Sequence, residues 1–322
     1  MNAACTWQGD VVSLVEAFRS GEGSPVDEVR ATLAAIEASD LNAFSFIDAE
    51  GALERAEVAD VSLPLGGVPI GVKELHQVEG WPDTHASLLF ADRTAPSDGT
   101  MVARLKAAGA NLVGLTTASE FGGLNCSTTK LNGITRNPWR RDATPGGSSG
   151  GSAAAVTGGL VPIATGGDGG GSIRIPASQN NLFGLRPTKG LSSIDGIIPL
   201  AHTQDVGGPL ARSVTDLAIG LDATIGPDPA DPATRMLEGR ELPQFVQSLD
   251  PVGQLSLSLG EFTRLAPLGA SAEAGFHLFV VQKHRRRVPR HTTERGRMHT
   301  KIHRQHTPCR MSTCARGERV RR

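Results

Sequence analysis

The stretch TPGGSSGGSAAAVTGGLVPIATGGDGGGSIRIP, residues 144–176, contains two loops rich in glycine and serine, separated by an alanine-rich segment and an apolar run. Glycine is unfavourable inside helices and strands, so this density indicates backbone in unusual conformations or close to a ligand. Each loop offers serine hydroxyls and consecutive backbone N–H groups, which a nucleophile and an anion-binding hole require. The stretch therefore predicts serine chemistry, for which the rest of the chain must supply a base.

A glycine-rich phosphate-binding loop is the main alternative for these residues. Neither loop continues as G-K-[ST], and neither has the pattern G-x-G-x-x-G opening a helix after an apolar strand, with an acidic residue well downstream. A nucleotide-binding loop is therefore disfavoured.

The segments around the two loops predict the fold class. Apolar residues at helical spacing follow the capping residues Asp10, Ser24 and Ser213. Further helices are expected over 50–60 and 98–108, strands over 68–72 and 111–116, and either a strand or a linker over 43–47. This alternation of strand and helix predicts a doubly wound α/β layer structure.

Composition narrows the class of protein further. The 322 residues include 39 Gly and no Tyr, which fits a loop-rich enzyme and argues against a surface that stacks on nucleic-acid bases. No apolar run reaches the roughly 18 residues of a membrane-spanning helix, and the N-terminus lacks a signal-peptide pattern. Four scattered cysteines do not make a disulfide framework. We expect a cytoplasmic protein without nucleic-acid or membrane partners.

The end of the chain differs in composition from the rest. Apolar periodicity is poor over 253–281, and residues 282–322 are rich in Arg and His, so this tail is expected to be basic and disordered. A basic tail also suits a nucleic-acid or membrane surface. A zinc site is a further alternative, but its candidate ligands match no common finger in order or spacing; they are His299, His303, His306, Cys309 and Cys314.

Several side chains outside the glycine–serine stretch are candidates for a site. Lys73 ends the strand predicted over 68–72 and is followed by Glu74; a strand-end lysine that reaches solvent is the alternative for this position. Four residues of the loop 119–142 would line a pocket or, as we favour, pack in the core: Phe121, Leu124, Cys126 and Trp139. The histidines before the tail are interpreted as surface or packing residues: His76, His85, His202 and His277.

Three blocks of the chain resemble the hallmark blocks of the amidase signature family: GVPIGVKEL (67–75), GGSSGGSAAA (146–155) and ATGGDGGGSIRIPAS (164–178). RNPW (136–139) and VGGPLARSVTD (206–216) are also similar to family segments. The resemblance implies an α/β/α fold with a central mixed β-sheet in one domain over residues 1–250. Because family enzymes continue further, we expect a fold incomplete at its C-terminal end, from truncation or a frameshift, with 251–281 as an atypical segment.

The resemblance also implies site residues. The nucleophile would be Ser172, the bridging serine after a cis peptide bond Ser148, and the base Lys73. Backbone N–H groups of Gly169, Gly170, Gly171 and Ser172 would form the oxyanion hole, and Ser149, Asp168 and Arg174 would support it. The implied substrate is a small-molecule amide, with no cofactor and no metal, and the oligomeric state stays open.

The chemistry of these residue types agrees with that interpretation. A serine hydroxyl is a poor nucleophile until a base takes its proton, and lysine is a base only when neutral, which burial favours. The hydroxyl of Ser148 would then relay the proton between Lys73 and Ser172. Alternatively, Ser172 caps a helix and Ser148 is a turn residue. At the level of function, the alternatives are a truncated, non-catalytic remnant and a glutamyl-tRNA amidotransferase catalytic-type subunit.

Overall fold

The computed structural model describes Trp7 and residues 9–249. The segment predicted to be atypical (251–281) and the basic tail (282–322), with its candidate zinc ligands, lie outside the described residues.

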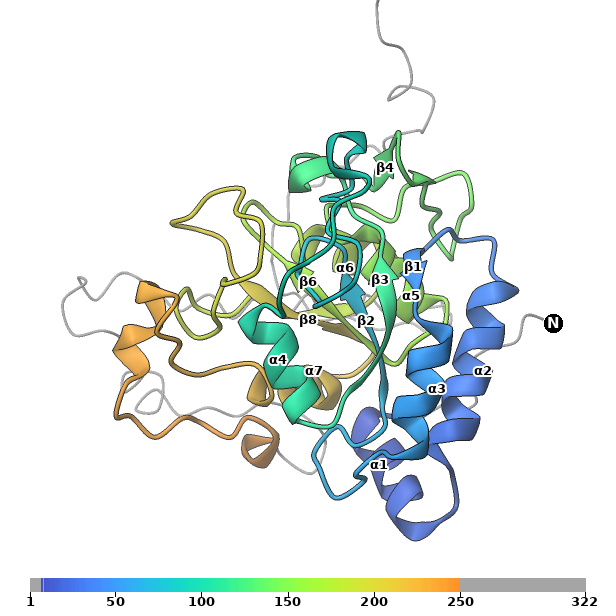
Figure 1. Ribbon diagram of the computed structural model, residues 1–322, viewed down its shortest axis with the longest axis vertical. Coiled ribbons are helices and arrows are strands. Elements are labelled where there is room, and N and C mark those ends of the chain that lie inside the picture. The colour runs from blue at the N-terminus through green and yellow to red at the C-terminus, as the bar shows by residue number, and fades with distance from the viewer. Residues whose placement is uncertain (1–6, 8, 250–322) are drawn as a thin grey trace, which may run out of the picture.

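A six-stranded mixed sheet in the order β1-β3-β2-β6-β8-β7 forms the centre of the molecule (Figure 1). β2 is parallel to β3 and β6, whereas the pairs β1–β3, β6–β8 and β7–β8 are antiparallel. The predicted central mixed sheet is therefore confirmed. The strands are β1 (Phe44–Ile47), β2 (Pro69–Lys73), β3 (Asn111–Thr116), β6 (Ile163–Gly167), β7 (Phe183–Gly184) and β8 (Gly207–Ala211).

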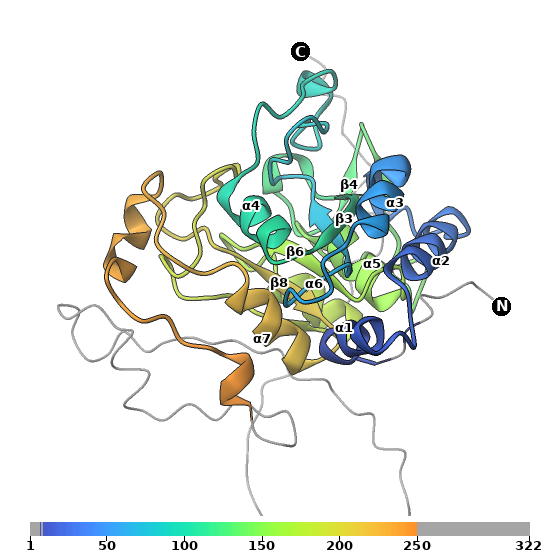
Figure 2. The same ribbon diagram turned by 60° about the horizontal axis from the view of Figure 1, so that its bottom comes forward.

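Helices cover both faces of the sheet, which makes the α/β/α arrangement (Figure 2). One apolar core joins the sheet to α1 (Val11–Ser20), α4 (Thr100–Ala107) and α7 (Val214–Asp222). A second core joins it to α2 (Pro25–Glu37), α3 (Ala49–Glu57), α5 (Gly150–Thr157) and α6 (Arg174–Asn180). Successive strand residues point to opposite faces, so Ile163 lies in the first core and Ala164 in the second.

The remaining short elements lie in connecting loops. They are η1 (Leu88–Phe90), η2 (Glu120–Gly122), β4 (Thr128–Thr129), β5 (Gly133–Ile134), η3 (Pro232–Leu237) and η4 (Val246–Ser248).

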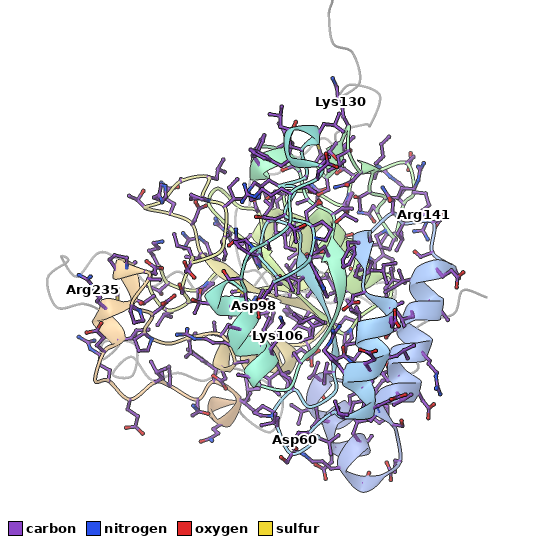
Figure 3. The ribbon with its side chains drawn as sticks, viewed as in Figure 1. Asp60, Asp98, Lys106, Lys130, Arg141 and Arg235 are labelled. Carbon is purple, nitrogen blue, oxygen red and sulfur yellow. The ribbon has the colours of Figure 1, made fainter. Side chains whose placement is uncertain are left out.

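The helix starts agree with the capping residues read from the sequence. Side chains of Asp10, Ser24 and Ser213 each accept a hydrogen bond from the backbone N–H three residues later. The helix expected over 98–108 begins at Thr100 instead, because the Asp98 carboxylate accepts from the N–H of Glu79 and from Lys106 and is held outside the helix (Figure 3).

Replacing the cap of α7 is expected to destabilise the fold moderately. Ser213→Ala removes the acceptor for the N–H of Asp216, which lies 3.0 Å from the serine oxygen. We expect the free energy of unfolding to fall by about 1 kcal/mol, measured by urea denaturation. Ser213→Thr, which keeps a hydroxyl as acceptor beside the buried carboxyl of Asp216, should recover most of the loss, and equal loss in both variants would contradict the capping role.

The topology brings three segments of the chain together. β2 and β6 run parallel, so their carboxyl ends lie at the same edge of the sheet. Lys73 ends β2, the loop before α6 follows β6, and α5 begins just after Ser148. In open α/β sheets, ligands bind at such strand ends.

Candidate active site

Lys73 is buried at the end of β2, with 2% of its surface exposed. The alternative of a strand-end lysine that reaches solvent is therefore wrong. Its Nζ donates to the hydroxyl of Ser148 at 2.7 Å and to the carbonyl of Gly167 at 3.3 Å. Its backbone N–H donates to Thr165 Oγ1 at 2.9 Å. The amine is thus held beside one of the predicted site serines.

The surroundings of Lys73 favour its neutral form. Burial lowers the pKa of Lys73 to about 7, although the charges of Asp168, Asp205 and Glu74 act to raise it. The neighbouring carboxyl of Glu74 is also buried, and burial raises its pKa to about 7 against hydrogen bonds from the N–H of Ala118 and from Asn132. A lysine with this pKa is partly neutral near pH 7 and is able to accept a proton.

Ser148 follows a cis peptide bond, which joins it to Gly147 as expected. A Cβ at position 147 would lie 2.5 Å from the backbone nitrogen of Cys126, so only glycine fits there. Ser127 Oγ donates to the Ser148 carbonyl at 3.3 Å and accepts from the N–H of Gly150 at 3.0 Å. The loop that carries Ser148 is therefore clamped on both sides.

Ser149 connects the first loop with the second. Its backbone N–H donates to the carbonyl of Ser172 at 3.2 Å. Its fully buried hydroxyl accepts from the N–H of Gly167 at 3.3 Å. The predicted supporting position of Ser149 thus lies between the two serine loops.

Asp168 organises the turn that leads to Ser172. Its carboxylate accepts from the N–H groups of Gly171 (2.7 Å) and Ile173 (3.2 Å) and from both Nε and Nη2 of Arg174 at 2.9 Å. Burial alone would raise the pKa of Asp168, but the hydrogen bonds and charge of Arg174 outweigh it and lower the pKa below the ordinary value. The buried carboxylate of Asp168, paired with the partly exposed Arg174, therefore braces the loop.

Of the four backbone N–H groups predicted to form the oxyanion hole, that of Gly171 is already used inside the loop. The Gly171 N–H donates to Asp168 within the loop, because the turn directs it back towards the carboxylate. In the described part of the chain, the N–H groups of Gly169, Gly170 and Ser172 donate to no protein acceptor. These three remain available to a ligand.

The predicted proton relay needs a hydrogen bond between the hydroxyls of Ser148 and Ser172, and this bond is not formed in the described part of the structure. Ser148 and Ser172 line the same pocket, but among residues 9–249 no hydrogen bond joins their hydroxyls. The pocket has about 330 Å³ of empty space, part of which is open to solvent. The other lining residues include two carboxylates, Asp168 and Asp205. The apolar ones include Leu75, Phe121, Ile197, Ile198 and Leu200.

Comparison with known proteins identifies the family. The family model described as Amidase matches residues 27–252, which is most of the chain. The chain belongs to the amidase family. A relative from Burkholderia pseudomallei (strain 668), named as a glutamyl-tRNA(Gln) amidotransferase subunit, is 43% identical over 228 residues, covering 69% of this chain and 46% of the relative. This amidase-family chain thus spans about half the length of the curated relatives it matches.

Solved structures of amidase signature enzymes share the fold. A peptide amidase from Stenotrophomonas maltophilia is 36% identical with a TM-score of 0.71, covering 76% of this amidase-family chain and 53% of that protein. A bacterial aryl acylamidase of the amidase signature family is 30% identical with a TM-score of 0.68, covering 77% and 52%.

Several side chains in or near this pocket have positions or exposures that the sequence analysis did not predict. His76, interpreted as a surface or packing residue, is buried and lines the pocket beside Lys73. Phe121 lines it as well, whereas Leu124 and Trp139 are 56% and 67% exposed, so the core packing favoured for them is wrong. Local sequence contains no signal for the outcomes at Phe121, Leu124 and Trp139, because they depend on how the loop 119–142 folds.

Metal ligands and membrane spans are both absent from the part of the chain that the structure describes. No group of three or more His, Cys, Asp or Glu side chains there is placed to hold a metal ion. None of the described helices is long and apolar enough to cross a membrane.

Proposed function

We propose that this chain hydrolyses the C–N bond of a small carboxylic acid amide through an acyl-enzyme on Ser172, with Ser148 as relay and Lys73 as base. The observation that carries the proposal is the buried amine of Lys73, which lies 2.7 Å from the hydroxyl of Ser148. Both groups share a pocket with Ser172. A structural lysine would gain nothing from burial beside the Ser148 hydroxyl, whereas a base needs the lowered pKa that burial produces.

In the first step, Ser172 Oγ attacks the amide carbonyl carbon while its proton passes to Ser148, whose own proton passes to Lys73. The negative charge that develops on the carbonyl oxygen is stabilised by the N–H groups of Gly169, Gly170 and Ser172. Collapse of the tetrahedral intermediate breaks the C–N bond, and Ser148 returns a proton to the leaving nitrogen. Water then cleaves the ester on Ser172, releasing the acid and restoring the hydroxyl.

Neighbouring polar residues hold the loops of Ser148 and Ser172 in place and take no part in the reaction themselves. Asp168 and Arg174 fix the turn that presents the three N–H groups, and Ser149 ties that turn to the loop of Ser148. We propose residues 1–250 as the amidase domain that carries these parts.

The rate of amide hydrolysis is expected to rise as pH passes about 7, because Lys73 must be neutral to accept a proton. Asp205→Asn removes a charge that raises the pKa of Lys73, so the acidic midpoint of kcat/KM should move down by up to about one pH unit. Asparagine still offers an oxygen to the N–H of Ala201, which preserves the loop. A pH–rate profile measures the shift, and an unchanged or higher midpoint would contradict the assignment of Lys73.

A glutaminase activity is the second candidate, because the similar relatives are named as amidotransferase subunits. Such a subunit would release ammonia from glutamine for transfer within a larger assembly, and the full transfer would need partner subunits. Of the two carboxylates that line the pocket, Asp168 is paired with Arg174, and Asp205 suits a positively charged or N–H-donating group of a substrate.

A panel of substrates separates these candidates. Purified full-length chain is incubated with simple aliphatic amides, aryl amides and glutamine, and the released ammonia or amine is quantified. Hydrolysis of the simple amides supports the stand-alone amidase, and selective release from glutamine supports the amidotransferase role. Soluble, folded chain that is inactive on every member would support the third candidate, a non-catalytic remnant.

A further inference from the structure

Asp205 brings a carboxylate to the pocket that the proposed mechanism does not use. The residue lies just before β8 and is 6% exposed. Its Oδ2 accepts from the N–H of Ala201 at 2.6 Å, which fixes the orientation of the side chain. Among residues 9–249, no donor reaches its Oδ1. This oxygen is not fully enclosed by protein, so a ligand in the pocket can reach it.

The charge of Asp205 has no protein counterion in the described part of the chain. Lys189 Nζ donates to the backbone carbonyl of Asp205 at 3.1 Å and forms no ion pair with the carboxylate. The two arginines close to the pocket, Arg174 and Arg186, lie 2.9 and 3.7 Å from the other carboxylate, Asp168. Buried charges in proteins are normally paired, so Asp205 suits a cation that arrives with the ligand.

The carboxylate of Asp205 lies directly against the proposed oxyanion hole. A Cβ at position 169 would overlap Asp205 Oδ1, so the carboxylate occupies the side-chain position of Gly169. The N–H of Gly169 is one of the three in this loop that donate to no acceptor within residues 9–249. An amide with its carbonyl oxygen on these N–H groups would therefore bring the group next to its carbonyl close to Asp205.

We propose that Asp205 is a specificity-determining residue, which selects amides with a protonated amine on the carbon next to the carbonyl, the α-amino acid amides. This inference rests on the proposed function, because it names the substrate class of the same site. The substrate ammonium would donate to Asp205 Oδ1 while the carbonyl oxygen lies on the backbone N–H groups.

The substrate cation also compensates an unfavourable charge. The carboxylate of Asp205 opposes the negative charge that develops on the carbonyl oxygen beside Gly169, and an ammonium bound to Asp205 offsets that repulsion. A neutral side group leaves the repulsion in place. Because the oxyanion exists only in the transition state, the preference should appear in kcat as well as in KM.

The same cation suits the state of Lys73. The charge of Asp205 acts to raise the pKa of Lys73, and so favours the ammonium form that cannot accept a proton. A cation bound to Asp205 cancels this influence and adds a positive charge near the amine, which disfavours protonation of Lys73. An α-amino acid amide thus favours the neutral base that the reaction needs.

Two amides of similar size test the preference. L-alaninamide and 2-methylpropanamide differ in one group, an amine in place of a methyl, and the amine, with a pKa of about 8, is protonated at pH 7. For the full wild-type chain at pH 7, we expect kcat/KM to be at least about tenfold higher for L-alaninamide. In Asp205→Asn, which keeps an acceptor for the Ala201 N–H, this ratio should fall by about tenfold. Comparing ratios removes the difference in intrinsic reactivity between the two amides.

Asp195→Asn is the matched control. Asp195 is exposed, lies in the same connection before β8 and accepts from Thr100 Oγ1 at 3.3 Å, away from the lining of the pocket. The exchange removes one negative charge from the same segment, so the ratio should stay at the wild-type value. An equal fall in Asp195→Asn and Asp205→Asn would mean that the net charge of the chain sets the preference, and would overturn the role of Asp205.

Binding to a Ser172→Ala chain measures the same preference without turnover. Isothermal titration calorimetry should give a Kd for L-alaninamide at least about tenfold lower than that for 2-methylpropanamide, and adding Asp205→Asn should remove the difference. The Ser172→Ala chain alone decides the question if the Asp205→Asn chains do not fold, as judged by thermal unfolding. Equal affinity for the two amides would then overturn the proposal.

The outcomes separate this inference from the proposed function. Hydrolysis of both amides with equal kcat/KM, or a ratio that Asp205→Asn leaves unchanged, would overturn the role of Asp205 while the roles of Ser172 and Lys73 stand. If instead the chain hydrolyses no amide but binds L-alaninamide selectively through Asp205, the specificity role is supported and the proposed function fails.

Discussion

Ser172→Ala is expected to lower kcat/KM for amide hydrolysis by at least about 10⁴-fold, because the alanine chain has no oxygen to form the acyl-enzyme. The exchange removes one atom from a side chain that is 5% exposed and makes no hydrogen bond through its hydroxyl among the described residues. Folding should therefore be preserved. Release of ammonia or amine from the best substrate of the panel measures the effect.

Lys73→Met is the matched variant for the base. Methionine has a similar length and removes the amine, so the activity should fall by a comparable factor while the thermal unfolding temperature stays the same or rises. The double variant should be no worse than either single one, because the residues act as one unit. Substantial activity in either single variant would exclude the proposed mechanism.

Asp168→Ala is expected to lower the free energy of unfolding by about 3 kcal/mol and to abolish activity. The variant leaves the Arg174 guanidinium without its buried partner and the N–H groups of Gly171 and Ile173 without an acceptor. Arg186, 3.7 Å from the same carboxylate, also loses a neighbouring charge. Urea denaturation of the full chain measures the stability.

Two comparisons test the reason for that loss. Because the folded-state pKa of Asp168 is lowered, its stabilisation is present above the ordinary Asp pKa of 3.8 and disappears as pH falls through the folded value. The gap between wild type and Asp168→Asn should therefore close in acid. Asp40→Asn, which weakens the exposed pair with Arg141 (labelled in Figure 3), should have little effect. Equal losses at positions 168 and 40 would refute the idea that burial of the Asp168 carboxylate makes its pairing important.

The layer structure was predictable from the chain because its signals are local. Capping residues and helical spacing of apolar side chains located α1, α2 and α7, and a continuous apolar run located β3. The boundaries of α3 and α4 differed from the prediction by a few residues. At α4 a tertiary contact of Asp98 with the Glu79 N–H and Lys106 competes with the helix.

The candidate site was predictable only in part. Glycine and serine density marked the two loops around Ser148 and Ser172, and the family blocks pointed to Lys73. The position of Asp205 in the pocket had no local signal, because it comes from a segment that meets Lys73 only in the folded chain. The hydrogen bond from the Gly171 N–H to Asp168 likewise depends on the conformation of the turn.

By itself, the sequence determined the layered α/β class, since this follows from the spacing of apolar residues along the chain. The resemblance of its glycine–serine and lysine blocks to a known family implied the amidase signature family and its α/β/α fold. The tertiary structure decided the chemical state of Lys73, because burial and the distances to Asp168, Asp205 and Glu74 set its pKa. The tertiary structure also decided which backbone N–H groups of the loop before Ser172 have no protein acceptor, and which groups the Lys73 amine contacts. Desolvation and hydrogen-bond geometry act through space, so no reading of neighbouring residues along the chain could supply them.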